Sequence, residues 1–249
     1  MSPIQGRLSV VIPHWNAKAL LPVCLDALAR QTYPDVQVIV VDNGSSDGSV
    51  SFVREHYPSV QIVALGENRG FTGACNAGIL ASDGEFVALL NNDTEVVPGW
   101  AEAIIAGFTA YPDAGIIASR MMLFDQRDHF HAAGDFVRID GQPGNRGVWE
   151  PDTGQYDEPA YVFSACGGAS AYRRCLLDDV GLLDDDFFFS LEDIDLAWRA
   201  QLGGYRCIYI PDAVVYHMLA PKLYATKRIL PGKRCAPGVA PPQGPACVV

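Results

Sequence analysis

The sequence lacks several features that would assign a protein of its size at once. No GxGxxG follows an apolar run and no GxxxxGK[ST] occurs, which excludes the two commonest loops that hold phosphate groups. The seven cysteines include no CxxC pair, so we expect reduced thiols rather than a zinc site or a disulfide framework. No apolar stretch approaches the roughly 18 residues of a membrane span, and no basic leader precedes the first apolar run. A cytoplasmic protein without a signal peptide is predicted.

Basic residues are also few. The 249 residues include 18 Lys plus Arg against 29 Asp plus Glu, a formal charge of −11. Nucleic-acid binding is therefore not expected, because a phosphate backbone requires clustered basic side chains. Five of the bases and none of the acids lie in residues 221–249, where nine Pro or Gly also occur. This segment predicts a loose basic tail, which is either simply solvated or in peripheral contact with anionic lipid at the inner face of the membrane.

Hydrophobic residues are plentiful, at 49%, and their pattern predicts an α/β protein. Short Val- and Ile-rich runs alternate with amphipathic stretches, which indicates βαβ units and a mostly parallel sheet. The strands are expected at residues 8–12, 36–41, 60–65, 86–90 and 114–118, and the helices at 19–30, 49–56, 72–81 and 100–110. Residues 121–159 are expected to be loop-like, because Gly and Pro interrupt any periodicity, and a helix near 191–202 and a strand at 207–210 follow.

Polar side chains follow the expected strands, where ligands bind in parallel sheets. In VVDNGSSDGS, Asp42 ends a strand, and its carboxylate suits a hydrogen bond from a nucleobase imide or a ribose hydroxyl. Asp47 is placed to cap the next helix. In ENRGFTGACNAG, small residues permit close backbone approach, and Arg69 is either a solvated side chain or a partner for phosphate or ribose.

Two acidic segments carry the candidate chemistry. In LLNNDTEV, Asp93 and Glu95 follow a wholly apolar strand, and paired carboxylates suit a hard divalent cation such as Mg²⁺ or Mn²⁺. In FFFSLEDIDLAWR, Glu192 and Asp193 lie beside three aromatic residues. Such surroundings raise the pKa of a carboxylate towards that of a useful general base. The histidine after the last strand, His217, is by itself more often structural than a ligand.

A serine hydrolase is a rival interpretation. GSSDG fits the GxSxG pattern of a nucleophile elbow around Ser46, and an acid and His217 follow in the right order. Three residues separate Asp42 from Ser46, however, and no HGGG-like oxyanion loop occurs, so the structural context of an elbow is missing.

The five motifs VVIPHWN, VVDNGSSDGS, ENRGFTGACNAG, LLNNDTEV and FFFSLEDIDLAWR together resemble the inverting GT-A glycosyltransferases of family 2, especially the rhamnosyltransferase-like branch. The resemblance covers residues 8–217. It implies a Rossmann-like, mostly parallel sheet flanked by helices, with a smaller acceptor-side region. Residues 1–119 form the expected nucleotide-sugar-binding half, residues 120–220 the half with the acceptor site and the catalytic base, and residues 221–249 the tail. Members usually continue with further helices, so we expect an altered or truncated C-terminus.

The resemblance also implies roles for single residues. Asp193 is the implied catalytic base and Glu192 the second choice. Asp93, Glu95 and His217 are the implied metal ligands, although Asn91 stands where the family's DxD motif has its first acid. The residues implied to contact the nucleotide-sugar are Pro13, Asn16, Asp42, Arg69, Asn92, Asp93, Gly167 and Gly168.

The implied activity is inverting and metal-dependent. A sugar moves from a UDP- or dTDP-linked donor, with dTDP-rhamnose as the branch-level expectation, to a hydroxyl of a glycan or lipid-linked saccharide in polysaccharide synthesis. The sequence singles out no second nucleophilic carboxylate of the kind that a retaining enzyme needs. A catalytically inactive nucleotide-sugar-binding protein is a third interpretation, and the oligomeric state is not encoded in any motif.

Overall fold

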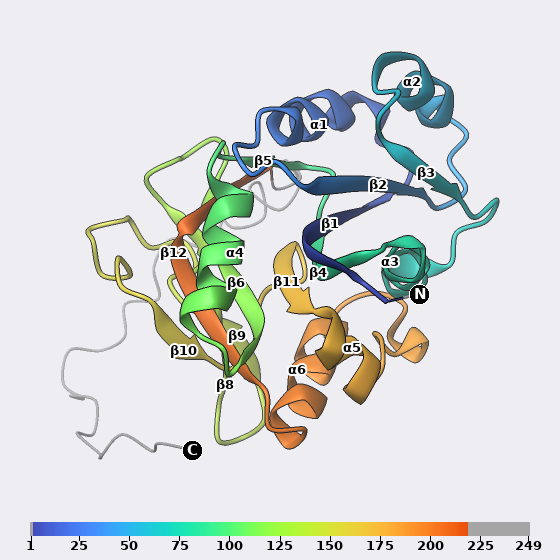
Figure 1. Cartoon of the computed structure of the whole chain (residues 1–249). Helices are drawn as coiled ribbons and strands as arrows, with labels where there is room; N and C mark the ends of the chain where they lie inside the picture. Colours follow the sequence, from blue (N-terminus) through green and yellow to red (C-terminus); the bar gives the residue numbers. More distant parts are fainter. Residues whose placement is uncertain (1, 219–249) are drawn as a thin grey trace. The chain divides into compact units, whose positions relative to one another are not determined.

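The computed structural model describes residues 2–218, and the elements of its first half alternate (Figure 1). They are β1 (Ile4–His14), α1 (Leu21–Ala29), β2 (Val36–Asp42), α2 (Ser49–His56), β3 (Gln61–Ala64), α3 (Gly70–Ala81) and β4 (Gly84–Leu90). These bounds confirm the strands and helices expected from the apolar runs, and α2 has the predicted limits.

The second half is more irregular. It comprises β5 (Thr94–Val96), α4 (Trp100–Ala110), β6 (Ala114–Leu123), β7 (Phe130–Ala132), β8 (Asp135–Val137), β9 (Pro143–Asn145), β10 (Ala160–Val162), β11 (Ala169–Arg173), α5 (Arg174–Val180), α6 (Glu192–Leu202) and β12 (Arg206–His217). Single 3-10 turns occupy Lys18–Leu20 and Asp185–Phe187.

One sheet runs through both halves, in the strand order β10-β12-β6-β11-β4-β1-β2-β3. The pairs β4-β1, β1-β2, β2-β3 and β12-β6 are parallel, whereas β11 is antiparallel to both of its neighbours. The predicted α/β class with a mostly parallel sheet is therefore confirmed. The inserted antiparallel strand carries the segment from Gly167 into the centre of the sheet.

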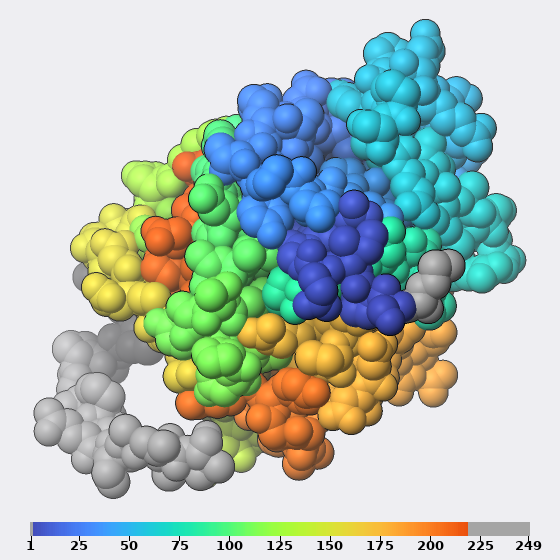
Figure 2. All heavy atoms as spheres, in the orientation of Figure 1, coloured from blue at the N-terminus to red at the C-terminus, as the bar shows by residue number. Residues whose placement is uncertain are grey.

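Helices cover both faces of this sheet because alternate strand residues point to opposite sides. Val10 and Ile12 of β1 pack in a cluster with α1, α2 and α4, whereas Val11 packs in a second cluster with α3, α5 and α6. In Figure 2, green atoms of α4 lie between the blue atoms of the first elements and the orange atoms of the last described ones. These two apolar clusters, one on each face of the sheet, hold the strands in position and with them the polar residues at the strand ends.

The segment 121–159 was expected to be loop-like, and this prediction was wrong in part. β6 extends to Leu123, β7 pairs with β6, and β8 and β9 form a separate hairpin. Strands of three residues are too short to show a period, and β7 is defined only by its pairing with Met121 and Met122 of β6. β12 is likewise longer than expected, because a register shift between Ile210 and Val214 carries the strand on to His217.

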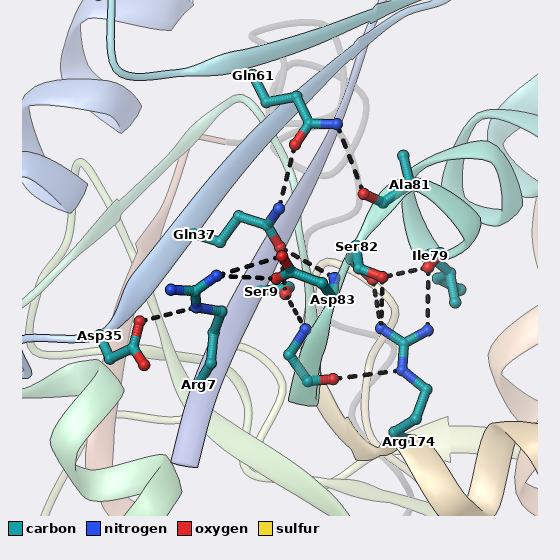
Figure 3. A network of polar contacts seen from close by, with 11 residues as sticks. Arg7, Ser9, Asp35, Gln37, Gln61, Ile79, Ala81, Ser82, Asp83 and Arg174 are labelled. Atoms are coloured by element: carbon teal, nitrogen blue, oxygen red, sulfur yellow. Dashed lines mark hydrogen bonds and ion pairs between the residues drawn. The ribbon is translucent and has the colours of Figure 1, made fainter. Parts of the chain in front are cut away.

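The strand ends opposite the polar residues are closed by a network of charged and amide side chains (Figure 3). Arg174 donates hydrogen bonds to the carbonyls of Ile79, Ser82 and Gly84, at 3.0, 3.2 and 3.3 Å. Ile79 and Ser82 lie at the C-terminus of α3, so the guanidinium caps this helix end, where the Ile79 carbonyl also accepts from Ser82. Arg7 makes ion pairs with Asp35 and Asp83 in the same network.

The expected basic tail, residues 221–249, lies outside the described residues. Within residues 2–218 there is no helix both long enough and apolar enough to cross a membrane.

Candidate active site

Asp42 lies at the carboxyl end of β2, beside His14 in the parallel register with β1. The Asp42 side chain is buried, and its Oδ2 accepts a hydrogen bond from the backbone N–H of Ser45 at 3.3 Å. Its Oδ1 is buried and has no hydrogen-bond partner among the described residues. A buried carboxylate oxygen without a donor is costly, so this atom is suited to receive one from a ligand.

The loop after β1 is fastened to the loop after β2. Asn16, which has a φ of 47°, accepts a hydrogen bond from the backbone N–H of Ser46 at 2.8 Å and donates one from its own N–H to Ser45 at 3.0 Å. Asp47 accepts from the N–H groups of Lys18 and Ser49. Asp47 thus receives an N–H of the first turn of α2, although Gly48 occupies the N-cap position.

The loop after β2 is also bound to the loop before α3, through Asn43. Its side chain donates to Asn68 Oδ1 and to the carbonyl of Gly70, both at 3.0 Å, and accepts from the N–H of Arg69 at 2.8 Å. The Arg69 guanidinium is about half exposed and faces Glu67 at 3.4 Å. Gly44 is required here, because a Cβ at this position would lie 2.8 Å from the Glu67 backbone.

The triplet after β4 sends its three side chains to three different neighbours. Asn91 lies against Gly168, where an added Cβ would come within 3.1 Å of the amide nitrogen. Asn92 Nδ2 lies 2.8 Å from His14 Nδ1. Asp93 Oδ1 lies 3.1 Å from His217 Nε2. The three side chains of the triplet therefore make separate contacts.

His14 and His131 are functional candidates that the motif reading missed. Burial lowers the pKa of His14, and its Nε2 has no hydrogen-bond partner within the part of the chain that the structure describes. The Nδ1 of His131 lies 3.2 Å from the Nδ1 of His217. His14 stood in a strand-end motif, so a signal existed, whereas His131 lay in the segment expected to be a loop.

The structure brings together Asp93 and His217, two of the three predicted metal ligands, but Glu95 has another partner. Its Oε2 lies 2.5 Å from Nη2 of Arg127. No group of three or more His, Cys, Asp or Glu in residues 2–218 is arranged to hold a metal ion. A carboxylate and an imidazole are nevertheless suitable donors for a divalent cation whose remaining ligands are water and substrate oxygens.

A cavity of about 360 Å³ lies between Asn91, the first residue of the triplet, and the N-terminus of α6. Its lining includes Asn91, Gly167, Gly168, Glu192 and Asp193. A Cβ on Gly167 would lie 3.2 Å from the Glu192 carboxylate and 3.3 Å from that of Asp193. The glycine therefore leaves room for the two acids at the cavity wall.

Asp193 is held in place by main-chain donors. Its Oδ2 accepts from the Gly167 N–H and its Oδ1 from the Ile194 N–H, both at 2.8 Å. Burial is the main cause that raises the pKa of Asp193, and the two hydrogen bonds oppose it. Burial also raises the pKa of Glu192, whose Oε2 has no partner among the residues described. Both carboxylates thus carry the increased basicity that a general base needs.

The turn that leads into α6 has an unusual backbone. Phe188, Ser190 and Leu191 all have positive φ values, at 49°, 77° and 73°. Residues other than glycine rarely adopt positive φ values, because this conformation strains the backbone. Such strain is often found at functional sites, where the surrounding structure maintains it. Here α3 holds the turn: the Phe71 N–H donates to the Phe188 carbonyl at 2.7 Å, and Asn76 donates to the Leu183 carbonyl at 2.8 Å.

Comparisons with known proteins identify the family. Residues 9–181 match the family model described as Glycosyl transferase family 2. The chain belongs to this family and is a glycosyltransferase, so the resemblance predicted from the five motifs is confirmed. The serine hydrolase interpretation is not supported: Ser46 bonds Asn16, whereas His217 contacts Asp93 and His131.

Two curated relatives come from Mycobacterium tuberculosis. The chain is 28% identical to an N-acetylglucosaminyl-diphospho-decaprenol L-rhamnosyltransferase, over 84% of this chain and 75% of the relative. It is 30% identical to a pre-mycofactocin glycosyltransferase, over 86% of this chain but only 43% of that protein.

Solved structures share the fold. A mannosyltransferase from Pyrobaculum calidifontis in complex with GDP-Man and Mn²⁺ matches with a TM-score of 0.64 and 23% identity, over 92% of this chain and 61% of that one. S. aureus TarS in complex with UDP matches with a TM-score of 0.65 and 19% identity, over 88% and 62%. The chain thus spans about three fifths of these structures.

Proposed function

We propose that this glycosyltransferase moves a sugar from a nucleoside diphosphate sugar to an acceptor hydroxyl, with inversion at the anomeric carbon. The observation that carries the proposal is Asp193, a partly buried carboxylate in a cavity, oriented by two N–H groups and with a raised pKa. Asp193 removes the proton of the acceptor hydroxyl while the oxygen attacks the anomeric carbon and the nucleoside diphosphate leaves. A single displacement inverts the configuration.

The donor site is the set of strand ends that begins at Asp42. The unpartnered Oδ1 of Asp42 suits the imide N–H of a uracil or thymine, and Pro13 and Asn16 border the same loop. Arg69 and Asn92 are proposed to contact the ribose and the diphosphate. A UDP- or dTDP-linked donor is proposed, with dTDP-rhamnose as the particular candidate that the rhamnosyltransferase relative supports.

Asp93 and His217 are the residues proposed to hold Mg²⁺ or Mn²⁺. Glu95, the third ligand that the resemblance implies, is ion-paired with Arg127 and is proposed to contribute less. When bound, a divalent cation neutralises charge on the departing diphosphate. A site with two protein ligands fits this purpose, because Mg²⁺ is usually held by one or two carboxylates together with substrate phosphates.

The acceptor is proposed to be a glycan or lipid-linked saccharide, with Gly167 and Gly168 at the border between donor sugar and acceptor. The relative that acts on a diphospho-decaprenol substrate supports a lipid-linked acceptor. We place the protein in the cytoplasm at the inner face of the membrane, in cell-surface polysaccharide synthesis.

The test is nucleotide release from a panel of UDP-, dTDP- and GDP-sugars with Mn²⁺ or Mg²⁺, with and without chelator. Metal-dependent release that is lost in Asp193→Asn and in Asp93→Ala supports transfer. Binding of a donor without release supports the inactive binding protein, and ester cleavage lost in Ser46→Ala supports the hydrolase. Either of the last two results contradicts the proposed function.

A further inference from the structure

A third carboxyl group lines the catalytic cavity, and it comes from a segment that shows no motif. Asp135, at the start of the β8-β9 hairpin, is only 3% exposed and lies in the cavity wall together with Glu192 and Asp193. The hairpin also contributes Pro143, Gly144 and Asn145 to the lining. The hairpin therefore forms a wall of the pocket in which the acceptor must lie.

The partners of Asp135 are neutral. Asn145 Nδ2 donates to its Oδ1 at 2.7 Å, and Ser164 Oγ donates to its Oδ2 at 3.3 Å. None of the ion pairs formed by residues 2–218 includes Asp135. A buried carboxyl without a cation is costly, and each of its oxygens retains the capacity for a further hydrogen bond.

Several titratable groups surround this carboxyl. Burial and, second, the charge of Asp193 raise the pKa of Asp135 to about 7, while Asn145 and Ser164 lower it. Burial first, and the charge of Asp135 second, raise the pKa of the Cys166 and Cys207 thiols. Perturbed carboxyl groups of this kind collect at functional sites, although a purely structural Asp that fastens the hairpin is the competing explanation.

We propose that Asp135 is an acceptor-binding residue that holds one hydroxyl of an uncharged acceptor sugar, beside the hydroxyl that Asp193 deprotonates. The proposal rests on the proposed function. Two carboxyl groups on the wall of one cavity can each accept a hydrogen bond from a hydroxyl of the same sugar ring. Phe71, Phe189 and Leu191 supply the apolar part of the lining, on which the C–H face of a ring can pack.

The charge of the cavity selects against anions. Its lining includes the carboxyl groups of Asp135, Glu192 and Asp193 and no Lys, Arg or His. An acceptor with a carboxylate on the ring that enters the cavity would be repelled and would find no cation to pair with. The sugar unit that receives the transfer is therefore uncharged.

The test is binding of matched glycosides to the full chain with nucleoside diphosphate present, followed by ligand-observed NMR. The probes are p-nitrophenyl glycosides of neutral hexoses, each paired with its uronic acid counterpart. We expect the neutral probes to bind at least tenfold more tightly than their anionic partners. Asp135→Ala is expected to weaken binding of the neutral probe about tenfold or more, since a hydrogen bond to a carboxyl group is lost.

Asp135→Asn is the variant that keeps the shape of the side chain and is the more conservative for folding. In wild type, the affinity for the neutral probe is expected to change between about pH 6 and 8, because Asp135 titrates there. The affinity of Asp135→Asn is expected to stay constant over the same range. A purely structural residue would not produce that difference. Asp125→Asn, an exposed carboxylate on the same segment, serves as the control.

Three results would overturn the proposal: no neutral probe binds, the uronic acid binds equally well, or both Asp135 variants bind with unchanged affinity and pH dependence. Failure here is distinct from failure of the proposed function. If wild type releases nucleotide from a donor but the glycoside results are negative, only the role of Asp135 is lost. If no donor is turned over, the proposed function itself fails.

Discussion

The backbone N–H of Gly167 donates a hydrogen bond to Oδ2 of Asp193 at 2.8 Å. This contact joins the strand that enters the sheet in the antiparallel sense, β11, to the N-terminus of α6. It directs the carboxylate along the cavity wall while leaving its basicity increased, because the burial that raises its pKa outweighs the two hydrogen bonds that lower it. Orientation and basicity of the base are therefore set by different parts of the fold.

The first prediction concerns this base. Asp193→Asn is expected to lower kcat for sugar transfer by about 100- to 10,000-fold, since an amide cannot accept the proton, while the KM for the donor changes little. Glu192→Gln is the matched comparison and is expected to have a smaller effect. Because the pKa of Asp193 is raised and the base must be ionised, kcat should rise with pH through that elevated pKa. Equal losses in both variants would contradict the assignment.

The second prediction separates the candidate metal ligands. Asp93 Oδ1 and His217 Nε2 lie 3.1 Å apart, close enough to bind the same ion. Asp93→Ala and His217→Ala should therefore each abolish the dependence of nucleotide release on Mn²⁺. Glu95→Gln should retain most metal dependence if the ion pair with Arg127 is the role of that carboxylate. Titration of Mn²⁺ against nucleotide release, and Mn²⁺ binding measured by electron paramagnetic resonance, check the three variants. If Glu95→Gln loses the metal as fully as Asp93→Ala does, Glu95 is a ligand.

Many residues of this site could be predicted from the sequence, because the apolar run of a strand ends abruptly at polar residues. Asp42, Asp93 and Asp193 stand at sharp transitions from apolar to polar residues. The structure places Asp42 at the end of β2, Asp93 in the turn between β4 and β5, and Asp193 in the first turn of α6. The contributions of His131 and Asp135 could not be predicted. They lie in strands of three residues, which are too short to show a period, and the side chains that they contact, His217 and Ser164, are remote in sequence.

The third prediction concerns Asn43, which fastens the two loops at the donor site. Asn43→Ala removes three hydrogen bonds, so we expect a loss of about 2 kcal/mol in the free energy of unfolding and a raised KM for the donor. Asn43→Asp retains an acceptor for the Arg69 N–H but loses the donor to Gly70. Urea unfolding and donor kinetics measure both variants. An unchanged donor KM in both would show that the link between the loops does not serve binding.

The fourth prediction tests the network of Figure 3. Arg174→Ala removes the hydrogen bonds that the guanidinium donates to the carbonyls of Ile79, Ser82 and Gly84, so the free energy of unfolding should fall by about 2–3 kcal/mol. The network lies at the strand ends opposite the site, so kcat at low temperature should be retained. Arg54→Ala, an exposed residue on α2, should cost less than about 0.5 kcal/mol. Equal stabilities of the two variants in urea would refute the capping role.

The last prediction is a pH dependence of stability that originates at Asp135. Its pKa is 3.8 in an unperturbed chain and about 7 in the folded protein. The group's contribution is fully present below the unfolded value and is lost as the pH rises to 7, because the unfolded chain releases the proton while the folded protein retains it. Since one pKa unit corresponds to about 1.4 kcal/mol, the loss amounts to a few kcal/mol.

Asp135→Asn has no such proton. Between about pH 4 and 7, its free energy of unfolding should therefore increase relative to that of wild type. Urea unfolding across this range measures the difference, and Asp125→Asn should run parallel to wild type. If Asp135→Asn also runs parallel, the buried carboxyl keeps an ordinary pKa, and the cavity must stabilise its charge by contacts other than Asn145 and Ser164.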